Sequence, residues 1–333
     1  MTPSKQQVHF TFVEKNVYSD FMMDRRIQVL RVVHALGTIT AAATSLHLTP
    51  SAVSQQLRGL AQELGVPLLE PDGRRVRLTP AAHVLLRHAD DLAAGWERAR
   101  AELQSDADLA GGPLRLAGFP SSLDLLVLPT ARRLRRTHPR LEVRITQVES
   151  AEAFPRLLTE QLDLAVTLPT RTGPSVDDTR YEQVHLLDDP LDLIVPADHP
   201  LAGQAGATLD DVAHEPWVLA APGSCDQHDL VTAACLTAGF SPRIAHEVTD
   251  WPLVAAMVGH GFGISLKPRL VPTPSEPALR VIPLRGPGIP HRRLFASLRR
   301  GSRDHPRIAL GLQALRHTAH TGPVDDSPVL QTA

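Results

Sequence analysis

Residues 48 to 65 read LTPSAVSQQLRGLAQELG and combine a helix start with an unusual polar face. Thr49 is suited to the N-cap, and Pro50 follows at the first helical position, where its missing N–H costs nothing. A helical period places one apolar stripe on Val53, Leu57, Leu60 and Leu64. The other side carries mainly short hydrogen-bonding groups and an arginine: Ser51, Ser54, Gln55, Arg58 and Gln62. An ordinary solvated helix would carry Glu and Lys there, so this face requires a further reason.

Two shorter helices are predicted before this one. Apolar residues recur at helical spacing within residues 25 to 34, and Gly37 is placed to end that helix. Thr38 or Thr40 can cap a second helix over residues 41 to 46, whose alanines allow a neighbouring helix to approach closely. Two helices joined by a short turn, with a polar outer face on the second, indicate a helix-turn-helix.

The stretch VPLLEPDGRRVRLTP, residues 66 to 80, reads as a β-hairpin. Residues 71 to 73, Pro-Asp-Gly, are predicted to form its turn. In the returning strand the two-residue alternation points Arg75 and Arg77 outward, beside Arg74 at the tip. The hairpin is therefore expected to form a positively charged wing.

A long amphipathic helix is predicted from residue 80 to residue 104. Its apolar positions follow a period near 3.6 and are Val84, Leu85, His88, Leu92, Trp96, Ala99 and Leu103. A helix between domains must bury such a stripe against another surface, and the simplest such surface is the same helix of a second chain. We therefore expect a homodimer.

The pattern changes to alternating strands and helices after the Gly-Gly-Pro of residues 111 to 113. LRLAGF, LEVRITQV and DLAVTL are predicted strands, with helices around 122 to 137 and 151 to 161. A second series starts around 191 to 196, and two further strands precede a last helix at 304 to 320. This pattern favours two similar α/β lobes that are joined by crossing strands and enclose a cleft.

Composition limits the remaining possibilities. The chain has 333 residues, enough for two or three domains, and its net charge of -2 argues against wholesale coating of nucleic acid or an acidic membrane. Two cysteines are too few for a disulfide scaffold and fit a reducing cytoplasm. No window reaches the roughly 18 apolar residues of a spanning helix, and no export signal is recognisable. We expect a cytoplasmic protein with no membrane partner.

Residues 23 to about 320 resemble the LysR-type transcriptional regulators. The most specific stretch is TAAATSLHLTPSAVSQQLRGLAQELGVPLLEPDGRRVRLTPAA, and PADHPLAG and GHGFGISL also match. Leu69 and Pro71 depart from the family pattern before the wing turn, and Ala82 stands where Gly is usual.

The resemblance implies a fold class and a set of domain boundaries. It implies a winged helix-turn-helix, a long linker helix, and a two-lobed α/β effector-binding domain like a type 2 periplasmic binding protein. The expected ranges are 1–22 as a disordered arm or mis-called start, 23–80 as the DNA-binding domain, 81–110 as the linker and dimerisation helix, 111–320 as the effector domain and 321–333 as a flexible tail. Within the effector domain, lobe 1 is expected over about 113–168 and 268–320, and lobe 2 over about 169–267.

The resemblance also implies partners and contact residues. A helix of this kind lies in the major groove of double-stranded DNA, where Ser, Gln and Arg meet base edges and phosphates. The implied DNA contacts are Pro50, Ser51, Ser54, Gln55, Arg58 and Arg74, with Arg75 and Arg77 as backbone candidates. A tetramer built from dimers and contact with RNA polymerase are further expectations.

A small effector is expected between the lobes. Ser121 and Ser122 lie at a predicted helix start, which favours an anion, so a carboxylate is the natural ligand. The opposing lobe offers the turn Pro222, Gly223 and Ser224, and the resemblance adds Ser150 and Thr167. The alternative for Ser121 and Ser122 is that they only cap a helix.

Other functions remain as alternatives. Cys225 and Cys235 could form a redox switch, as in a peroxide-sensing branch of the family, although Asp226 opposes thiolate formation. A solute-binding or adaptor protein could use the basic run RRLRR at 132 to 136, which otherwise reads as a solvated helix face. No HExxH, GxSxG, Walker or CxxC spacing appears, so we expect no enzyme activity, metal or cofactor.

Overall fold

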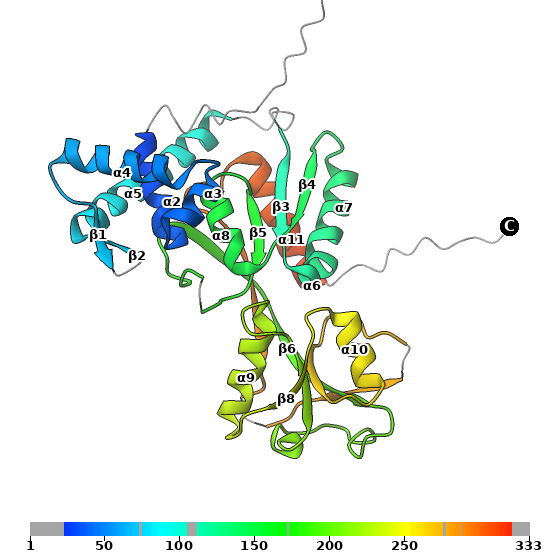
Figure 1. Cartoon of the computed structure of the whole chain (residues 1–333). Helices are drawn as coiled ribbons and strands as arrows, with labels where there is room; N and C mark the ends of the chain where they lie inside the picture. The colour runs from blue at the N-terminus through cyan, green and yellow to red at the C-terminus, as the bar shows by residue number, and fades with distance from the viewer. Residues whose placement is uncertain are drawn as a thin grey trace, which may run out of the picture. The chain divides into compact units, whose positions relative to one another are not determined.

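The computed structural model describes residues 23–72, 75–104, 112–171, 173–275, 278–286 and 288–321. The chain divides into two compact units, residues 1–96 and 97–333 (Figure 1). The arm and the tail expected at 1–22 and 321–333 lie, apart from residue 321, outside the described residues.

Three helices form the core of the first unit: α2 (Arg25–Leu36), α3 (Ile39–Ser45) and α4 (Pro50–Leu64). Each begins at a cap that the sequence encodes. Thr38 accepts a hydrogen bond from the N–H of residue 41 and Thr49 from that of residue 52, at 3.1 and 3.2 Å. Gly37 and Gly65 end α2 and α4 with φ of 71° and 68°, the left-handed conformation that glycine adopts without strain. The helix-turn-helix prediction is confirmed, with Thr38 as the cap of the second helix.

The apolar stripe of α4 packs into this core over its first three turns. Val53, Leu57 and Leu60 are at most 3% exposed and contact residues of α2 and α3. Leu64 is 46% exposed, so the expectation that it continues the stripe is wrong. Leu64 is the last residue of α4, whereas the three buried leucine and valine side chains of the stripe lie in its earlier turns.

The predicted hairpin forms from β1 (Leu69–Asp72) and β2 (Arg75–Leu78), which pair antiparallel. The register joins Asp72 to Arg75, so residues 71 and 72 belong to the strand rather than to the turn where the sequence analysis placed them. Arg74 lies outside the described residues, as does the side chain of Arg75. The wing is therefore present, and its strands extend closer to the tip than expected.

The long helix is α5 (Pro80–Leu103), one residue shorter than predicted. Its buried side begins with Ala82 and Leu86, which complete the core of the first unit. On the same side Asp90 accepts a hydrogen bond of 2.7 Å from Arg31 of α2, and both side chains are about nine-tenths buried. The predicted apolar stripe is a different face, on which Val84 and Leu92 are 45% and 65% exposed.

The second unit starts with a parallel strand-helix repeat. Its first lobe contains β3 (Leu114–Gly118), α6 (Pro120–Ser122), the π-helix η2 (Leu123–Val127), α7 (Leu128–Thr137), β4 (Val143–Gln147), α8 (Ser150–Leu158) and β5 (Leu164–Thr167). The chain returns to this lobe in β11 (His291–Arg299) and α11 (Pro306–Thr321). Strand β3 pairs parallel with β4 and β5, and leucines of these strands and of α7 and α11 form the core.

The second lobe contains its own core around Trp217. Its elements are the 3₁₀ helix η3 (Asp210–Val212), β7 (Pro216–Leu219), α9 (Asp226–Thr237), β8 (Arg243–Glu247), α10 (Trp251–Gly259), β9 (Ser265–Pro268) and β10 (Leu279–Pro283). The sequence analysis placed residues from 268 onward in lobe 1, whereas Ile282 and Leu284 pack in this second core. The cause is strand pairing, because β10 lies antiparallel to residues 192–196 of β6.

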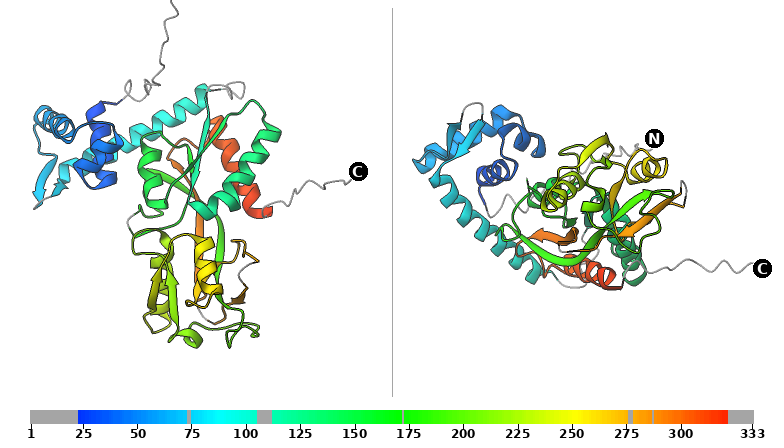
Figure 2. Two further views of the ribbon diagram at one scale, coloured as in Figure 1. Left: turned by 45° about the vertical axis from the view of Figure 1, so that its right-hand side comes forward. Right: turned by 90° about the horizontal axis from the view of Figure 1, so that it is seen from below.

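Two long strands connect the lobes. Strand β6 (Tyr181–Pro196) pairs with β11 over its first half and with β9 and β10 over its second half. The seven-stranded sheet therefore runs β10-β6-β11-β5-β3-β4, with β9 beside β6. The strands β6, in green, and β11, in orange, can be followed from one lobe into the other (Figures 1 and 2). The sequence analysis found crossing strands but missed the first half of β6, whose residues are mostly polar.

Candidate functional site

The exposed face of α4 is the first candidate site. Ser51, Gln55 and Arg58 are exposed and Ser54 is half-buried, so they form a stripe opposite the buried one. Pro50 is exposed at the start of the helix. The first turn therefore presents two hydroxyls and an amide to a partner, and an arginine follows one turn later.

A purely structural role for Arg58 would be an ion pair with a neighbour such as Glu63. The structure instead joins Glu63 to Arg26, with 2.6 Å between the carboxylate and the guanidinium. Among the described residues, no ion pair or hydrogen bond involves Arg58. Its charge is thus available to an external phosphate or base.

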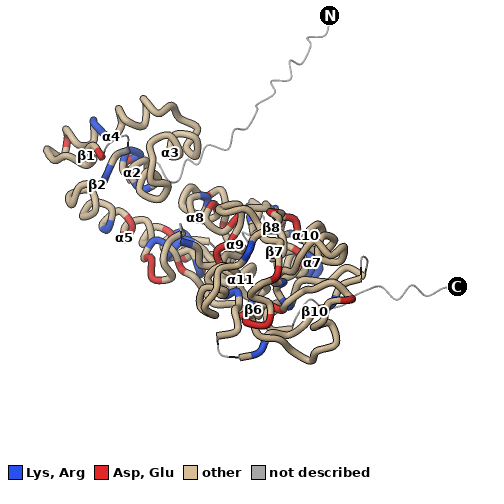
Figure 3. Tube along the Cα trace, turned by 60° about the horizontal axis from the view of Figure 1, so that its bottom comes forward, with Lys and Arg blue, Asp and Glu red and all other residues tan. Residues whose placement is uncertain are grey.

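The wing places basic side chains close to acidic ones. Arg77 is 70% exposed and lies 2.6 Å from Glu70, its cross-strand neighbour in the hairpin. Basic residues lie on both α4 and β2 (Figure 3). The sequence analysis assigned Arg77 to the phosphate backbone without noticing that Glu70 faces it, because the register of the hairpin decides that pairing.

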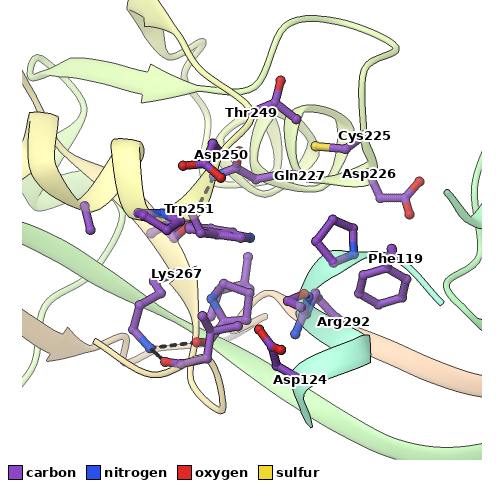
Figure 4. Close-up of a pocket in the computed structure, with 18 of the residues that line it drawn as sticks. Phe119, Asp124, Cys225, Asp226, Gln227, Thr249, Asp250, Trp251, Lys267 and Arg292 are labelled. Carbon is purple, nitrogen blue, oxygen red and sulfur yellow. Dashed lines mark hydrogen bonds between the residues drawn. The ribbon is translucent and has the colours of Figure 1, made fainter. Parts of the chain in front are cut away.

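A cavity of about 730 Å³ between the two lobes of the second unit is the second candidate site. Residues of the loop and helix after β3 line it on one side, and residues of α9, α10 and β9 line it on the other (Figure 4). Its size is that of a small-molecule pocket, and its position matches the predicted cleft.

Arg292 of β11 is a buried cation in the wall of this cavity. Its side chain is 7% exposed, and its guanidinium donates to Asp189 at 2.6 Å and to the Ser121 hydroxyl at 2.8 Å. The guanidinium carbon Cζ of Arg292 also lies 5.5 Å from the centre of the Phe119 ring. The buried Nε has no acceptor among the described residues. The guanidinium therefore retains donor capacity beside the cavity, which suits a ligand acceptor.

Lys267 also lines the cavity, but its ammonium is already satisfied. It donates to the carbonyl oxygens of Pro268 at 2.9 Å and of Arg269 at 3.4 Å, and also to that of Val271. Burial lowers the pKa of Lys267, and the nearby carboxylates Asp192 and Asp189 oppose this effect. Lys267 thus fixes the loop after β9 and contributes no spare donor comparable to that of Arg292.

Two carboxyl groups from opposite lobes line another side of the cavity. Glu149 lies just before α8, and Asp226 is the first residue of α9. Burial raises the pKa of Glu149 to about 7, and the charges of Asp226 and Glu152 add to the rise. Burial likewise raises the pKa of Asp226, although a hydrogen bond of 3.0 Å from Ser150 opposes it.

The structure places the predicted effector residues in different environments. Ser121 lines the cavity and contacts Arg292. Ser122 is fully buried, and its hydroxyl donates to the carbonyl of residue 119 at 2.8 Å; its side chain makes no capping hydrogen bond to a backbone N–H. Ser150 does not line the cavity but orients Asp226, and it accepts a bond from the N–H of residue 168 at 3.0 Å.

The remaining predicted effector residues lie outside the cavity wall. Thr167 is buried and bonded to the hydroxyl of Ser297 at 2.7 Å. Pro222, Gly223 and Ser224 are exposed, and the Ser224 hydroxyl donates to residue 221 at 2.7 Å. The sequence analysis missed Arg292, Glu149 and Asp226. In the sequence these residues stand out only as charges inside a predicted strand or near the start of a helix. That pattern does not show which charged side chains line the same cavity.

The two cysteines are separated by a helix. Cys225 is the N-cap of α9 and Cys235 lies ten residues along it, which at ~1.5 Å per residue is about 15 Å. A disulfide requires Cα atoms closer than about 7 Å, so this pair cannot join while α9 is intact. Burial raises the pKa of Cys225, and it raises the pKa of Cys235 to about 12. Neither thiol has the lowered pKa of a reactive cysteine.

Among the described residues, no group of three or more His, Cys, Asp or Glu could hold a metal ion. Over the same part of the chain no single helix is long and apolar enough to cross a bilayer. The bent pair α2 and α3 passes that test by length and composition, and it forms the buried core of the first unit.

Comparison with known proteins identifies both domains of the chain. Residues 25–83 match the description "Bacterial regulatory helix-turn-helix protein, lysR family", and residues 107–319 match "LysR substrate binding domain". The chain is 28% identical over 229 residues to the hydrogen peroxide-inducible genes activator of Pectobacterium carotovorum subsp. carotovorum, covering 69% of this chain and 74% of that protein. It is also 28% identical over 241 residues to the transcriptional dual regulator GltC of Bacillus subtilis, covering 72% and 78%.

A solved structure shares the fold. Full-length CbnR in complex with its target DNA superposes with a TM-score of 0.53 at 24% sequence identity, covering 90% of this chain and 100% of that chain. The protein therefore belongs to the LysR family of DNA-binding transcriptional regulators, with a winged helix-turn-helix and a two-lobed effector-binding domain.

Proposed function

We propose that this regulator reads its operator with the exposed face of α4 and responds to a small acidic effector held at Arg292. The observation that carries the first part is the exposed face itself: among the described residues, no side-chain hydrogen bond or ion pair involves Gln55 or Arg58, and the Ser51 hydroxyl contacts only that of Thr49, at 3.0 Å. Arg77 contributes a backbone contact from the wing. Arg74 and Arg75 are assigned to the same role by the resemblance alone.

The observation that carries the effector assignment is the buried guanidinium of Arg292. It lines the cavity with an Nε that lacks an acceptor, and Ser121 lies 2.8 Å from one of its terminal nitrogens. Charged hydrogen bonds of this kind favour a carboxylate ligand. The effector can change DNA binding only by its difference in affinity between two arrangements of the protein.

The active form in this proposal is a homodimer in the cytoplasm, where its DNA lies, with further assembly to a tetramer and contact with RNA polymerase. Val84 and Leu92 support the dimer, since they expose a large apolar area on α5. A dimer doubles the phosphate contacts and reads a two-fold site.

The test of DNA reading is a selection of random duplexes by the purified full chain at ~0.15 M salt, because affinity depends steeply on salt. Gln55→Ala is expected to relax the preference at one base pair, at a cost of about 1–3 kcal/mol for the preferred base. Gln62→Ala is the matched control, since Gln62 is exposed on the same face one to two turns later. An unchanged preference in Gln55→Ala contradicts the assignment, and the absence of any selected sequence favours the adaptor function.

The redox alternative has a separate test. The chain is treated with hydrogen peroxide, free thiols are counted, and DNA binding is measured before and after. We expect both thiols to remain and the affinity to stay the same, because α9 holds them about 15 Å apart. A Cys225–Cys235 disulfide that changes DNA binding would overturn this expectation.

A further inference from the structure

We propose that the effector is zwitterionic: besides its acidic group it carries a protonated amine, which binds between the carboxylates of Glu149 and Asp226. This proposal rests on the proposed function, because it names the chemical class of the ligand in the same cavity. It adds a second recognition point in that cavity.

The position of the two carboxylates supports a bound cation. Glu149 precedes α8 in the first lobe, and Asp226 begins α9 in the second. Both line the cavity, and the Ser150 hydroxyl of α8 donates to Asp226 at 3.0 Å. The two carboxylates are therefore brought together from different lobes. An ammonium group that touches both would link the lobes directly.

Among the described residues no cationic side chain forms an ion pair with Glu149 or Asp226, although the nearby charge of Arg292 partly opposes the rise in the pKa of Asp226. Lys267 is occupied by backbone carbonyls, and Arg292 is paired with Asp189. Among the described residues, no hydrogen bond or ion pair reaches the Glu149 carboxylate. Burial raises the pKa of both carboxyl groups; the charge of Asp226 adds to the rise at Glu149, and the charge of Asp229 adds to the rise at Asp226. A ligand cation would remove that cost.

An independent observation places the opposite charge of the ligand. Arg292 is more than nine-tenths buried, lines the cavity and keeps a buried Nε with no acceptor among the described residues. An acidic group satisfies that nitrogen, while Glu149 and Asp226 require a donor with positive charge. Trp251 and Leu230 supply apolar wall for the body of the ligand. One molecule with both charges meets all three demands.

The test uses four small probes on the full chain at pH 7: butyrate, butylamine, 2-aminobutyrate and 4-aminobutyrate. Ligand-observed NMR gives their affinities, and competition shows whether they share one site. We expect at least one aminobutyrate to bind about tenfold more tightly than butyrate, the size of one charged hydrogen bond. Butylamine is expected to bind detectably and not to compete with butyrate, because the two probes bind different charged residues of the cavity.

Three variants locate the amine. Glu149→Gln and Asp226→Asn preserve side-chain size and should each reduce the aminobutyrate affinity toward that of butyrate, leaving butyrate binding unchanged. Asp124→Asn is the matched control, because Asp124 lines the same cavity but is exposed. It should change the affinity less than twofold. Equal loss in Asp124→Asn and Glu149→Gln would show a general negative field and overturn the proposal.

A proton count gives a readout that is independent of affinity. At pH 7 a carboxyl with a pKa of about 7 is half protonated, so an amine that binds Glu149 should release roughly half a proton. Calorimetry in buffers of different ionisation enthalpy measures this release, which should vanish in Glu149→Gln. Butyrate binding without any amine response overturns the proposal and leaves the acidic effector standing. Failure of all four probes overturns both ligand assignments, while the DNA selection decides DNA reading separately.

Discussion

Removing the charge of Asp189 should destabilise the effector domain far more than removing the charge of its neighbour Asp188. Asp189 is fully buried and accepts a bond of 2.6 Å from Arg292, whose side chain is 7% exposed. Asp189→Asn leaves that guanidinium buried without a counter-charge. Breaking a buried pair in this way costs about 3–5 kcal/mol. Asp189 also accepts from the N–H of Leu270 at 3.0 Å, a bond that the Asn oxygen can keep.

Asp188 provides the matched control on the same strand. Its side chain is 45% exposed and lies 3.4 Å from Arg293, so Asp188→Asn should change the stability by at most about 1 kcal/mol. Urea unfolding is followed by tryptophan fluorescence in a Trp96→Phe background, which leaves Trp217 and Trp251 in the second unit as reporters. With a slope of ~3 kcal/mol per M, Asp189→Asn should lower the midpoint by about 1 M or more.

A double substitution separates the cost of an unpaired charge from the loss of the pair. Asp189→Leu with Arg292→Met removes both charges, and well-packed apolar replacements of a buried pair are often neutral or stabilising. The double variant should therefore unfold at a higher midpoint than Asp189→Asn while losing butyrate binding, although it stays below the original chain because the N–H of Leu270 loses its acceptor. If Asp189→Asn shifts the midpoint no more than Asp188→Asn does, the reasoning about the buried pair is refuted.

Three further outcomes are expected. Glu70→Gln should raise the DNA affinity several-fold and steepen its salt dependence by about one unit, because it removes the carboxylate that lies 2.6 Å from Arg77 and frees Arg77 for a phosphate. Fluorescence anisotropy at several salt concentrations measures both quantities. An unchanged slope of log affinity against log salt contradicts the contact. Leu92→Glu should shift the dimer toward monomer in sedimentation analysis. Leu92 is 65% exposed on the stripe of α5, and a dimer formed through that stripe would bury the charge of the introduced carboxylate. An unaltered dimer places the interface elsewhere. The pKa of Glu149 in the folded chain, about 7, lies above its ordinary 4.5, so the folded chain binds the proton more tightly than the unfolded chain does. The free energy of unfolding should therefore fall as pH rises from about 4.5 to 7. Glu149→Gln should flatten that part of the profile of urea midpoint against pH, and an equally steep profile in the variant would assign the slope to another group.

The DNA-binding unit could be predicted almost completely because its determinants are local. Thr49 and Pro50 start α4, Gly65 ends it, and the stripe of Val53 and Leu57 sets the buried side within four residues at a time. The errors there concern ends. Leu64, the last residue of α4, is exposed, and Pro71 and Asp72 lie in β1 rather than in the turn, because strand register depends on pairing.

The effector cavity was only partly predictable. The sequence analysis placed Ser121 in the cleft, where the structure has it beside Arg292, a residue 171 positions away. Residues such as Thr167 carry hydroxyls at plausible positions, but neighbouring strands satisfy them. Burial and hydrogen bonding decide whether a polar side chain faces a ligand or the core, and both depend on elements that are distant in the sequence.

The sequence by itself determined the helix-turn-helix, its polar face and the two-lobed α/β pattern, since capping and periodicity act between residues a few positions apart. Only the tertiary structure decided which charges share the cavity. Strand β6 pairs with β11 so that Asp189 meets Arg292, and the packing of the two lobes brings Glu149 toward Asp226. Those encounters depend on register and packing over long sequence separations, and no local pattern encodes them.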